Sequence, residues 1–363
     1  MATTGPVSGE VDGRPVVTFA SNDYLGLTHH PRVVAAAHAA LDRWGTGSGA
    51  SRLVVGSRPL HAELEAELAA WKGTEAALLF PTGFAANLGV LATLGSDDVT
   101  ILSDALNHAS IVDGARQARA QVRVYRHDDL GHLTELLDRV AAPGRAALVV
   151  TDSAFSMDGD VVDVDGLLGA CARHGALLVL DEAHAVLGPP VDVAAAAARG
   201  VTVLRVGTLS KALGSLGGFV AGPRRYVDLL RNRARPFIFT TAPTPADTAA
   251  ALAAVRVVRS PEGGALTARL RHHVERLRAG HPTPIVPVVL GDELVAVAAS
   301  QALLAQGLLV PAIRPPTVPA GTSRLRVALS AAHDAAQVDA LVAALAGLGG
   351  EVPEAVGTGT GPR

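Results

Sequence analysis

Cysteine is almost absent from this chain of 363 residues, since Cys171 is its single example. One cysteine cannot form an intramolecular disulfide or a cysteine-based metal cluster, and we expect no metal site. An excess of one charge is also missing, because 31 basic residues stand against 34 acidic residues and the net charge is -3. This balance predicts no binding of nucleic acid, whose recognition needs a basic surface.

Long uncharged apolar runs are missing as well. The longest candidates are interrupted by Asp192, by Asp247 and by the pair Asp292 and Glu293, so none has the length of a membrane span. The first 11 residues contain no basic region followed by an apolar run, which argues against a signal peptide. From these absences we expect a cytoplasmic protein without a membrane partner.

Hydrophobic residues, in contrast, make up 49% of the chain, which is enough for a large core. Apolar runs alternate with helical patterns between residues 76 and 233, and this alternation predicts an α/β fold with a mostly parallel sheet between helices. Beyond residue 242 the pattern favours a smaller α+β domain. We therefore expect an N-terminal arm and segment at 1–45, a large domain at 46–241, a small C-terminal domain at 242–350 and a flexible tail at 351–363.

Two expected strands of the sheet end in polar residues that a core would not favour. Asp181 and His184 follow one strand, and Thr208 and Lys211 follow the next. Ligands of open α/β sheets bind outside the carboxyl ends of the strands, so these side chains should share one crevice. A lysine can hold pyridoxal phosphate as a Schiff base, and an aspartate can keep the pyridinium nitrogen protonated. The combination predicts a pyridoxal phosphate site.

Each of these residues has a plainer explanation when it is taken alone. Asp181 could cap a helix, and Lys211 could be a solvated loop lysine. The segment 181–184 also matches the magnesium-binding box of helicases, but the chain has no phosphate-binding loop upstream, and the glycine-rich segment 45–52 lacks the required lysine. The order of aspartate, histidine and lysine, each beyond a strand end, favours the cofactor site.

Other candidates follow further strand ends. Gly83 and Phe84 open a helix whose backbone N–H groups could bind a phosphate, although an ordinary turn would look the same. His108 could stack on a cofactor ring, and Ser156 could donate to its phenolic oxygen or cap a turn. Arg314 precedes two prolines, and a rigid arginine suits the capture of a carboxylate, although it could also be a surface residue.

Together these residues resemble the α-oxoamine synthase family of fold-type I pyridoxal phosphate enzymes, from Phe19 to about Leu348. The matching segments are Ser-Asn-Asp-Tyr-Leu-Gly-Leu (21–27), Gly-Ser-Gly-Ala-Ser-Arg (47–52), Gly-Phe-Ala-Ala-Asn (83–87), Asn-His-Ala-Ser (107–110), Phe-Ser-Met-Asp-Gly-Asp (155–160), Asp-Glu-Ala-His (181–184) and Thr-Leu-Ser-Lys (208–211). Family members usually carry an N-terminal helix before the first of these segments, with an arginine that contacts the acyl substrate. No match to that helix is visible in residues 1–18, so Arg14 is not given this role.

The resemblance implies a catalytic role for several of these residues. Lys211 would form the Schiff base and later move the α-proton, while Asp181 would pair with the pyridinium nitrogen. His184 and Ser156 would contact the phenolic oxygen. His108 would stack on the ring and reach the substrate.

The resemblance also implies which residues bind the phosphate and the substrate. The backbone of Gly83 and Phe84, together with Thr208, would bind the cofactor phosphate. Arg314 would hold the carboxylate of the amino acid, and Thr317 would touch the substrate.

Within the family, segments 312–319 and 324–333 are most similar to members that condense L-alanine with a pimeloyl thioester and release carbon dioxide in biotin biosynthesis. The acyl carrier is coenzyme A or acyl carrier protein, and the family implies a homodimer with the site at the subunit interface. Glycine with acetyl-CoA or succinyl-CoA stays an alternative, because one methyl group is worth only ~1–3 kcal/mol in a pocket. An aldolase or racemase on the same fold, or a binding protein without catalysis, are more distant alternatives.

Overall fold

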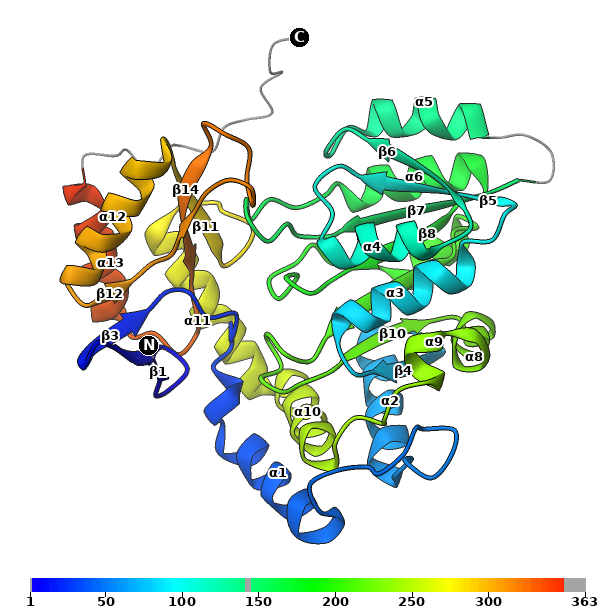
Figure 1. The fold of residues 1–363 in the computed structure, drawn as a ribbon, viewed down its shortest axis with the longest axis horizontal. Coiled ribbons are helices and arrows are strands. Elements are labelled where there is room, and N and C mark those ends of the chain that lie inside the picture. The colour runs from blue at the N-terminus through cyan, green and yellow to red at the C-terminus, as the bar shows by residue number, and fades with distance from the viewer. Residues whose placement is uncertain (1, 141–144, 349–363) are drawn as a thin grey trace. The chain divides into compact units, whose positions relative to one another are not determined.

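The computed structural model describes residues 2–140 and 145–348, and the chain divides into two compact units (Figure 1). The large unit contains residues 27–155 and 161–263, and the small unit contains residues 1–26, 156–160 and 264–363. The domain limits expected after residues 45 and 241 stay predictions. The expected tail at 351–363 lies outside the described residues.

A seven-stranded sheet with the order β4-β10-β9-β8-β7-β5-β6 forms the centre of the large unit. Its strands are β4 (Ala76–Phe80), β5 (Val99–Asp104), β6 (Gln121–Tyr125), β7 (Ala146–Asp152), β8 (Leu177–Asp181), β9 (Val203–Thr208) and β10 (Gly218–Gly222). Strand β10 runs antiparallel to both of its neighbours, and the other pairs are parallel. The mostly parallel sheet predicted from the sequence is therefore confirmed.

Several helices of the large unit begin at residues that favour a helix N-terminus. Proline occupies the first turn of the first two long helices and of the tenth, where its missing N–H costs no hydrogen bond. The helical segments are η1 (Leu27–His29), α1 (Pro31–Trp44), α2 (Pro59–Lys72), α3 (Gly83–Leu94), α4 (Ala109–Gln117), α5 (Leu130–Val140), α6 (Val164–His174), α7 (Val193–Ala198), α8 (Arg224–Arg233), α9 (Arg235–Ile238) and α10 (Pro245–Val258).

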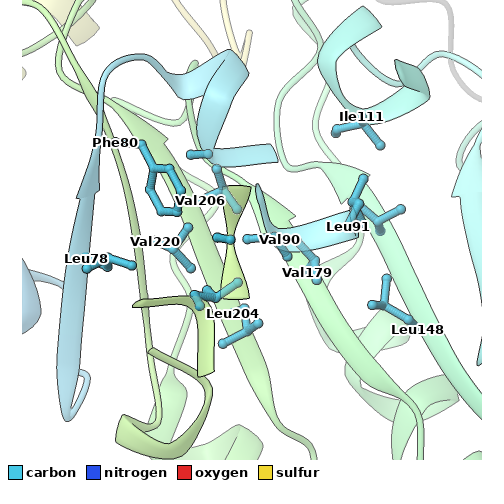
Figure 2. Packing of buried hydrophobic residues seen from close by; sticks show 14 of the residues in the cluster. Leu78, Phe80, Val90, Leu91, Ile111, Leu148, Val179, Leu204, Val206 and Val220 are labelled. Carbon is cyan, nitrogen blue, oxygen red and sulfur yellow. The ribbon is translucent and has the colours of Figure 1, made fainter. Parts of the chain in front are cut away.

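Two apolar clusters cover the two faces of this sheet. Figure 2 shows one of them, in which Val179 of β8 and its strand neighbours pack against Val90 and Leu91 of α3. On the other face Leu178 and Leu180 pack with residues of α5 and α6. Successive strand residues point to opposite faces, so β8 is buried on both sides and its sequence is an unbroken apolar run.

Within residues 2–348, the small unit contains two smaller sheets and three helices. One sheet has the order β1-β2-β3-β12, and the other has the order β11-β14-β13. The strands are β1 (Ala2–Thr3), β2 (Ser8–Val11), β3 (Arg14–Thr18), β11 (Ile285–Gly291), β12 (Leu308–Leu309), β13 (Ala312–Ile313) and β14 (Ser323–Ala328); the helices are α11 (Pro261–Leu277), whose residues 261–263 belong to the large unit, α12 (Glu293–Ala305) and α13 (Ala335–Gly347). Across residues 2–140 and 145–348, no helix combines the length and the apolarity that crossing a membrane requires.

A buried ion network fixes the carboxyl end of β8 in the large unit. Glu182 Oε2 lies 2.7 Å from Lys72 Nζ at the end of α2, and Glu182 Oε1 lies 2.6 Å from an Arg205 guanidinium nitrogen on β9. The side chains of Lys72, Glu182 and Arg205 are 12%, 2% and 11% exposed, so water screens their charges weakly. The strand end is thereby tied to a helix and to the next strand.

We predict that Glu182→Ala lowers the free energy of unfolding by about 3–5 kcal/mol, because it leaves two buried cations without their anion. Urea unfolding followed by circular dichroism measures this change. The matched control is Asp113→Asn, which removes an exposed pair with Arg116 at 3.7 Å and should cost less than ~1 kcal/mol. Equal midpoints for the two variants would contradict a stabilising role for the buried network.

Candidate active site

The carboxyl ends of β7, β8 and β9 carry three polar residues side by side. Asp152 ends β7, Asp181 ends β8 and Thr208 ends β9. Asp152 and Asp181 are register partners on neighbouring parallel strands, so their side chains point to the same face of the sheet. These polar residues therefore lie at the edge where parallel sheets bind ligands.

Asp181 is a buried carboxylate, only 5% exposed, that accepts two hydrogen bonds from neutral donors. The Asn87 amide donates to its Oδ2 at 2.6 Å, and the backbone N–H of Ala183 donates to its Oδ1 at 2.8 Å. A carboxylate offers about four acceptor sites, so Asp181 can accept a further donor. An N–H⁺ group of a ligand would suit this position, because a charged donor makes the stronger hydrogen bond.

Lys211 supplies a half-buried amine, and its Nζ lies 2.8 Å from Nε2 of His184. The chain contains only one other lysine, Lys72. Lys72 is held by Glu182, and its Nζ lies 4.0 Å from the centre of the Trp71 ring. Lys211 is therefore the amine that a ligand at this sheet edge can reach, and the pairing of His184 with Lys211 brings two predicted site residues together.

The N-terminus of α3 offers a site for an anion. Thr82 caps this helix by accepting from the Ala85 N–H at 3.0 Å, while the N–H groups of Gly83 and Phe84 have no acceptor within the helix. A Cβ built on Gly83 would lie 3.2 Å from Cβ of Thr208, so only glycine fits there without a shift. The helix dipole, two free N–H groups and the Thr208 hydroxyl together suit a phosphate.

His108 and Phe84 form an exposed aromatic pair at the same edge, with ring centroids 6.3 Å apart and an interplanar angle of 80°. Partial burial lowers the pKa of His108 from its ordinary value; the charge of Asp181 opposes this change and that of Lys211 adds to it. The His108 backbone N–H donates to Asp152 Oδ2 at 2.7 Å. Burial, strengthened by the charge of Asp181, raises the pKa of the Asp152 carboxyl well above its ordinary value.

The structure thus brings seven of the ten predicted site residues to one edge of the large unit. These are Gly83, Phe84, His108, Asp181, His184, Thr208 and Lys211. The other three, Ser156, Arg314 and Thr317, belong to the small unit. Arg314 and Thr317 are exposed, and the Ser156 carbonyl accepts from Nε of the buried Arg326 at 2.5 Å.

Three polar residues of the site were not given a role from the sequence. Asp152 follows the same rule as Asp181, since it ends a buried strand, and that signal was available. Asn87 and Ser110 are each 1% exposed and lie on helices within apolar surroundings. Only the structure shows that Asn87 is buried next to Asp181 and that Ser110 is buried next to His108.

Comparison with known proteins identifies the family of this chain. The family model for "Aminotransferase class I and II" matches residues 14–345. A curated relative from Anaeromyxobacter sp. (strain K), named 8-amino-7-oxononanoate synthase, is 53% identical over 97% of this chain and 92% of its own length. Further curated relatives with the same name come from Methylobacterium and Halorhodospira, among others.

Solved structures share the fold. A variant serine palmitoyltransferase from S. paucimobilis, solved with a bound PLP–myriocin aldimine, superposes with a TM-score of 0.90 at 32% identity, over 96% of this chain and 91% of that one. An 8-amino-7-oxononanoate synthase from Francisella tularensis superposes with a TM-score of 0.74 at 24% identity, over 92% and 97%, and is similar in fold. The predicted fold type is confirmed, and the chain belongs to the aminotransferase class I and II family.

Proposed function

We propose that this protein uses pyridoxal phosphate to condense L-alanine with a pimeloyl thioester, releasing carbon dioxide and forming 8-amino-7-oxononanoate. The observation that carries the proposal is the meeting of a buried carboxylate, an accessible lysine and a free helix N-terminus at one sheet edge. The 53% identity to a curated relative with this named activity supports the choice of reaction.

The residues of the large unit fit the cofactor group by group. The N-terminus of α3 and Thr208 would hold the phosphate dianion, and Asp181 would accept from the ring N–H⁺. His108 presents an exposed ring for stacking, and Lys211 Nζ would hold the aldehyde carbon. No other lysine competes, because Lys72 is bound in its own ion network.

Bound pyridoxal phosphate supplies an electron sink for the bond electrons released at the α-carbon of the amino acid. Asp181 contributes by keeping a proton on the ring nitrogen, since its buried carboxylate stabilises a positive charge there. Lys211 Nζ takes the α-proton as general base and returns a proton later. His184, 2.8 Å from that amine, orients it and can exchange a proton with it.

The substrate contacts and the assembly extend the proposal beyond the large unit. Arg314 would bind the carboxylate of the amino acid, Ser156 would contact the phenolic oxygen and Thr317 would touch the substrate. We further propose a homodimer with the site at the interface. Leu53, Val54 and Val55 are three consecutive exposed apolar residues of the large unit, and such an interface would bury them.

We predict that Lys211→Ala abolishes turnover, since no other amine reaches the site. Borohydride reduction of the wild-type holoenzyme followed by peptide mapping should place the cofactor on Lys211. The chain contains two lysines, so a lysine-bound label lies either on Lys211 or on Lys72. A label on Lys72, or substantial turnover by the variant, would contradict the assignment.

We predict that Asp181→Asn keeps the fold but lowers kcat by roughly 10²–10³-fold, the loss typical of removing one electrostatic stabiliser. Thermal melting checks the fold, and steady-state kinetics of the loaded enzyme check the rate. Asp163→Asn is the matched control, because Asp163 caps α6 away from the site and asparagine caps equally well. Near-wild-type rates for Asp181→Asn would mean that another group protonates the ring.

Substrate identity is tested by visible absorbance of the loaded protein titrated with L-alanine, glycine, L-serine and L-threonine, each with and without pimeloyl-CoA. We expect saturation with L-alanine and a new long-wavelength band when pimeloyl-CoA is added. A response to glycine instead would move the protein to a sister enzyme with the same chemistry. A colourless protein that takes up no cofactor would favour a binding protein without catalysis.

A further inference from the structure

Asn87 joins two residues of the candidate site through one amide group. It lies on α3, is 1% exposed, and donates from Nδ2 to Asp181 Oδ2 at 2.6 Å and to Ser110 Oγ at 2.9 Å. Rotating the amide by 180° would turn its oxygen toward a carboxylate and leave two acceptors facing each other. The charge on Asp181 therefore fixes the orientation of Asn87, and both amide hydrogens are used.

The second amide hydrogen occupies one of the two lone pairs of Ser110 Oγ, which favours the hydroxyl as a donor to its other neighbour. That neighbour is His108 Nδ1, 2.8 Å from Oγ. The backbone N–H of Ser110 donates to the same nitrogen at 3.2 Å. Two donors meet at Nδ1, so this nitrogen carries no proton and the imidazole proton lies on Nε2.

The charges around His108 come from three elements. Asp181 at the end of β8 favours the imidazolium, while Lys211 after β9 disfavours it. Asp152 at the end of β7 binds the backbone N–H of His108. Burial is the largest influence and lowers the pKa of His108, and the hydrogen bonds donated to Nδ1 act in the same direction because they favour the neutral ring.

We propose that Asn87 is a positioning residue that acts through Ser110 to hold His108 neutral, with its proton on Nε2, while the same amide orients Asp181. The inference rests on the proposed function in one respect, namely that His108 stacks on a protonated cofactor ring. An imidazolium there would repel the protonated ring. A neutral imidazole can stack, and its Nε2–H stays available as a donor.

The test is ¹⁵N NMR of the holoenzyme labelled at histidine, titrated between about pH 5 and pH 8. His108→Gln identifies the signals of His108 among the 13 histidines. In wild type we expect the neutral ring to carry its proton on Nε2 and not on Nδ1. In Asn87→Ala the Ser110 oxygen loses the donor that favours its hydroxyl hydrogen pointing to Nδ1, so it becomes a better acceptor for Nδ1–H. We expect the protonation constant of His108 to rise about tenfold, the effect of one hydrogen bond.

Two serine variants make the comparison specific. Ser110→Ala removes the hydroxyl donor to Nδ1 and should also raise the protonation constant of His108. It tests the same hydrogen-bond path if Asn87→Ala does not fold. Ser153→Ala is the matched control, because Ser153 is equally buried and donates to the Asp181 carbonyl at 2.8 Å, outside the path to His108. It should leave the titration of His108 within about twofold of wild type.

Three outcomes would overturn the proposal: a proton on Nδ1 of the neutral ring in wild type, an unchanged titration in the Asn87 and Ser110 variants, or an equal shift in Ser153→Ala. Cofactor loading is measured first by visible absorbance. A protein that takes up no cofactor counts against the proposed function alone, because the hydrogen-bond path lies within the chain and its titration is then measured on the ligand-free protein.

Discussion

The buried carboxylate of Asp181 is the constraint on which the rest of the site depends. Strand β8 is buried on both faces, so its last residue leaves the sheet in surroundings where an unpaired charge is costly. Two neutral donors, from Asn87 and Ala183, lower that cost without cancelling the charge. The remaining negative charge is what allows the site to keep a ligand nitrogen protonated.

The two lysines of the chain divide their tasks according to their surroundings. Lys72 is buried against Glu182 and Trp71 and fixes the end of α2 to the strand that carries Asp181. Lys211 is half-buried beside the imidazole of His184, on the loop after β9. Lys72 stabilises the frame, and in the proposed function Lys211 would reach the ligand, so neither could substitute for the other.

The sequence predicts the site best where two simple rules coincide. Asp181, His184, Thr208 and Lys211 follow apolar runs, and the carboxyl ends of parallel strands gather at one edge, so their meeting could be foreseen. The antiparallel direction of β10 could not be predicted in this way, because an apolar run of five residues does not show in which direction the strand runs. The sequence did not indicate a site role for Asn87 and Ser110, because a polar residue inside a helical pattern is normally exposed. Only the packing of α3 against α4 buries both.

The chemistry at position 87 explains why an amide stands there. Two acceptors, a carboxylate and a hydroxyl, must be satisfied by one side chain that adds no charge. A carboxylate would repel Asp181, whereas a lysine or arginine would neutralise it and remove the attraction for a ligand cation. A serine offers one hydrogen and could serve only one acceptor. Asparagine has two amide hydrogens and no charge, and its Nδ2 lies within 3 Å of both acceptors. The same amide can therefore orient the Asp181 carboxylate and, through Ser110, influence where His108 carries its proton.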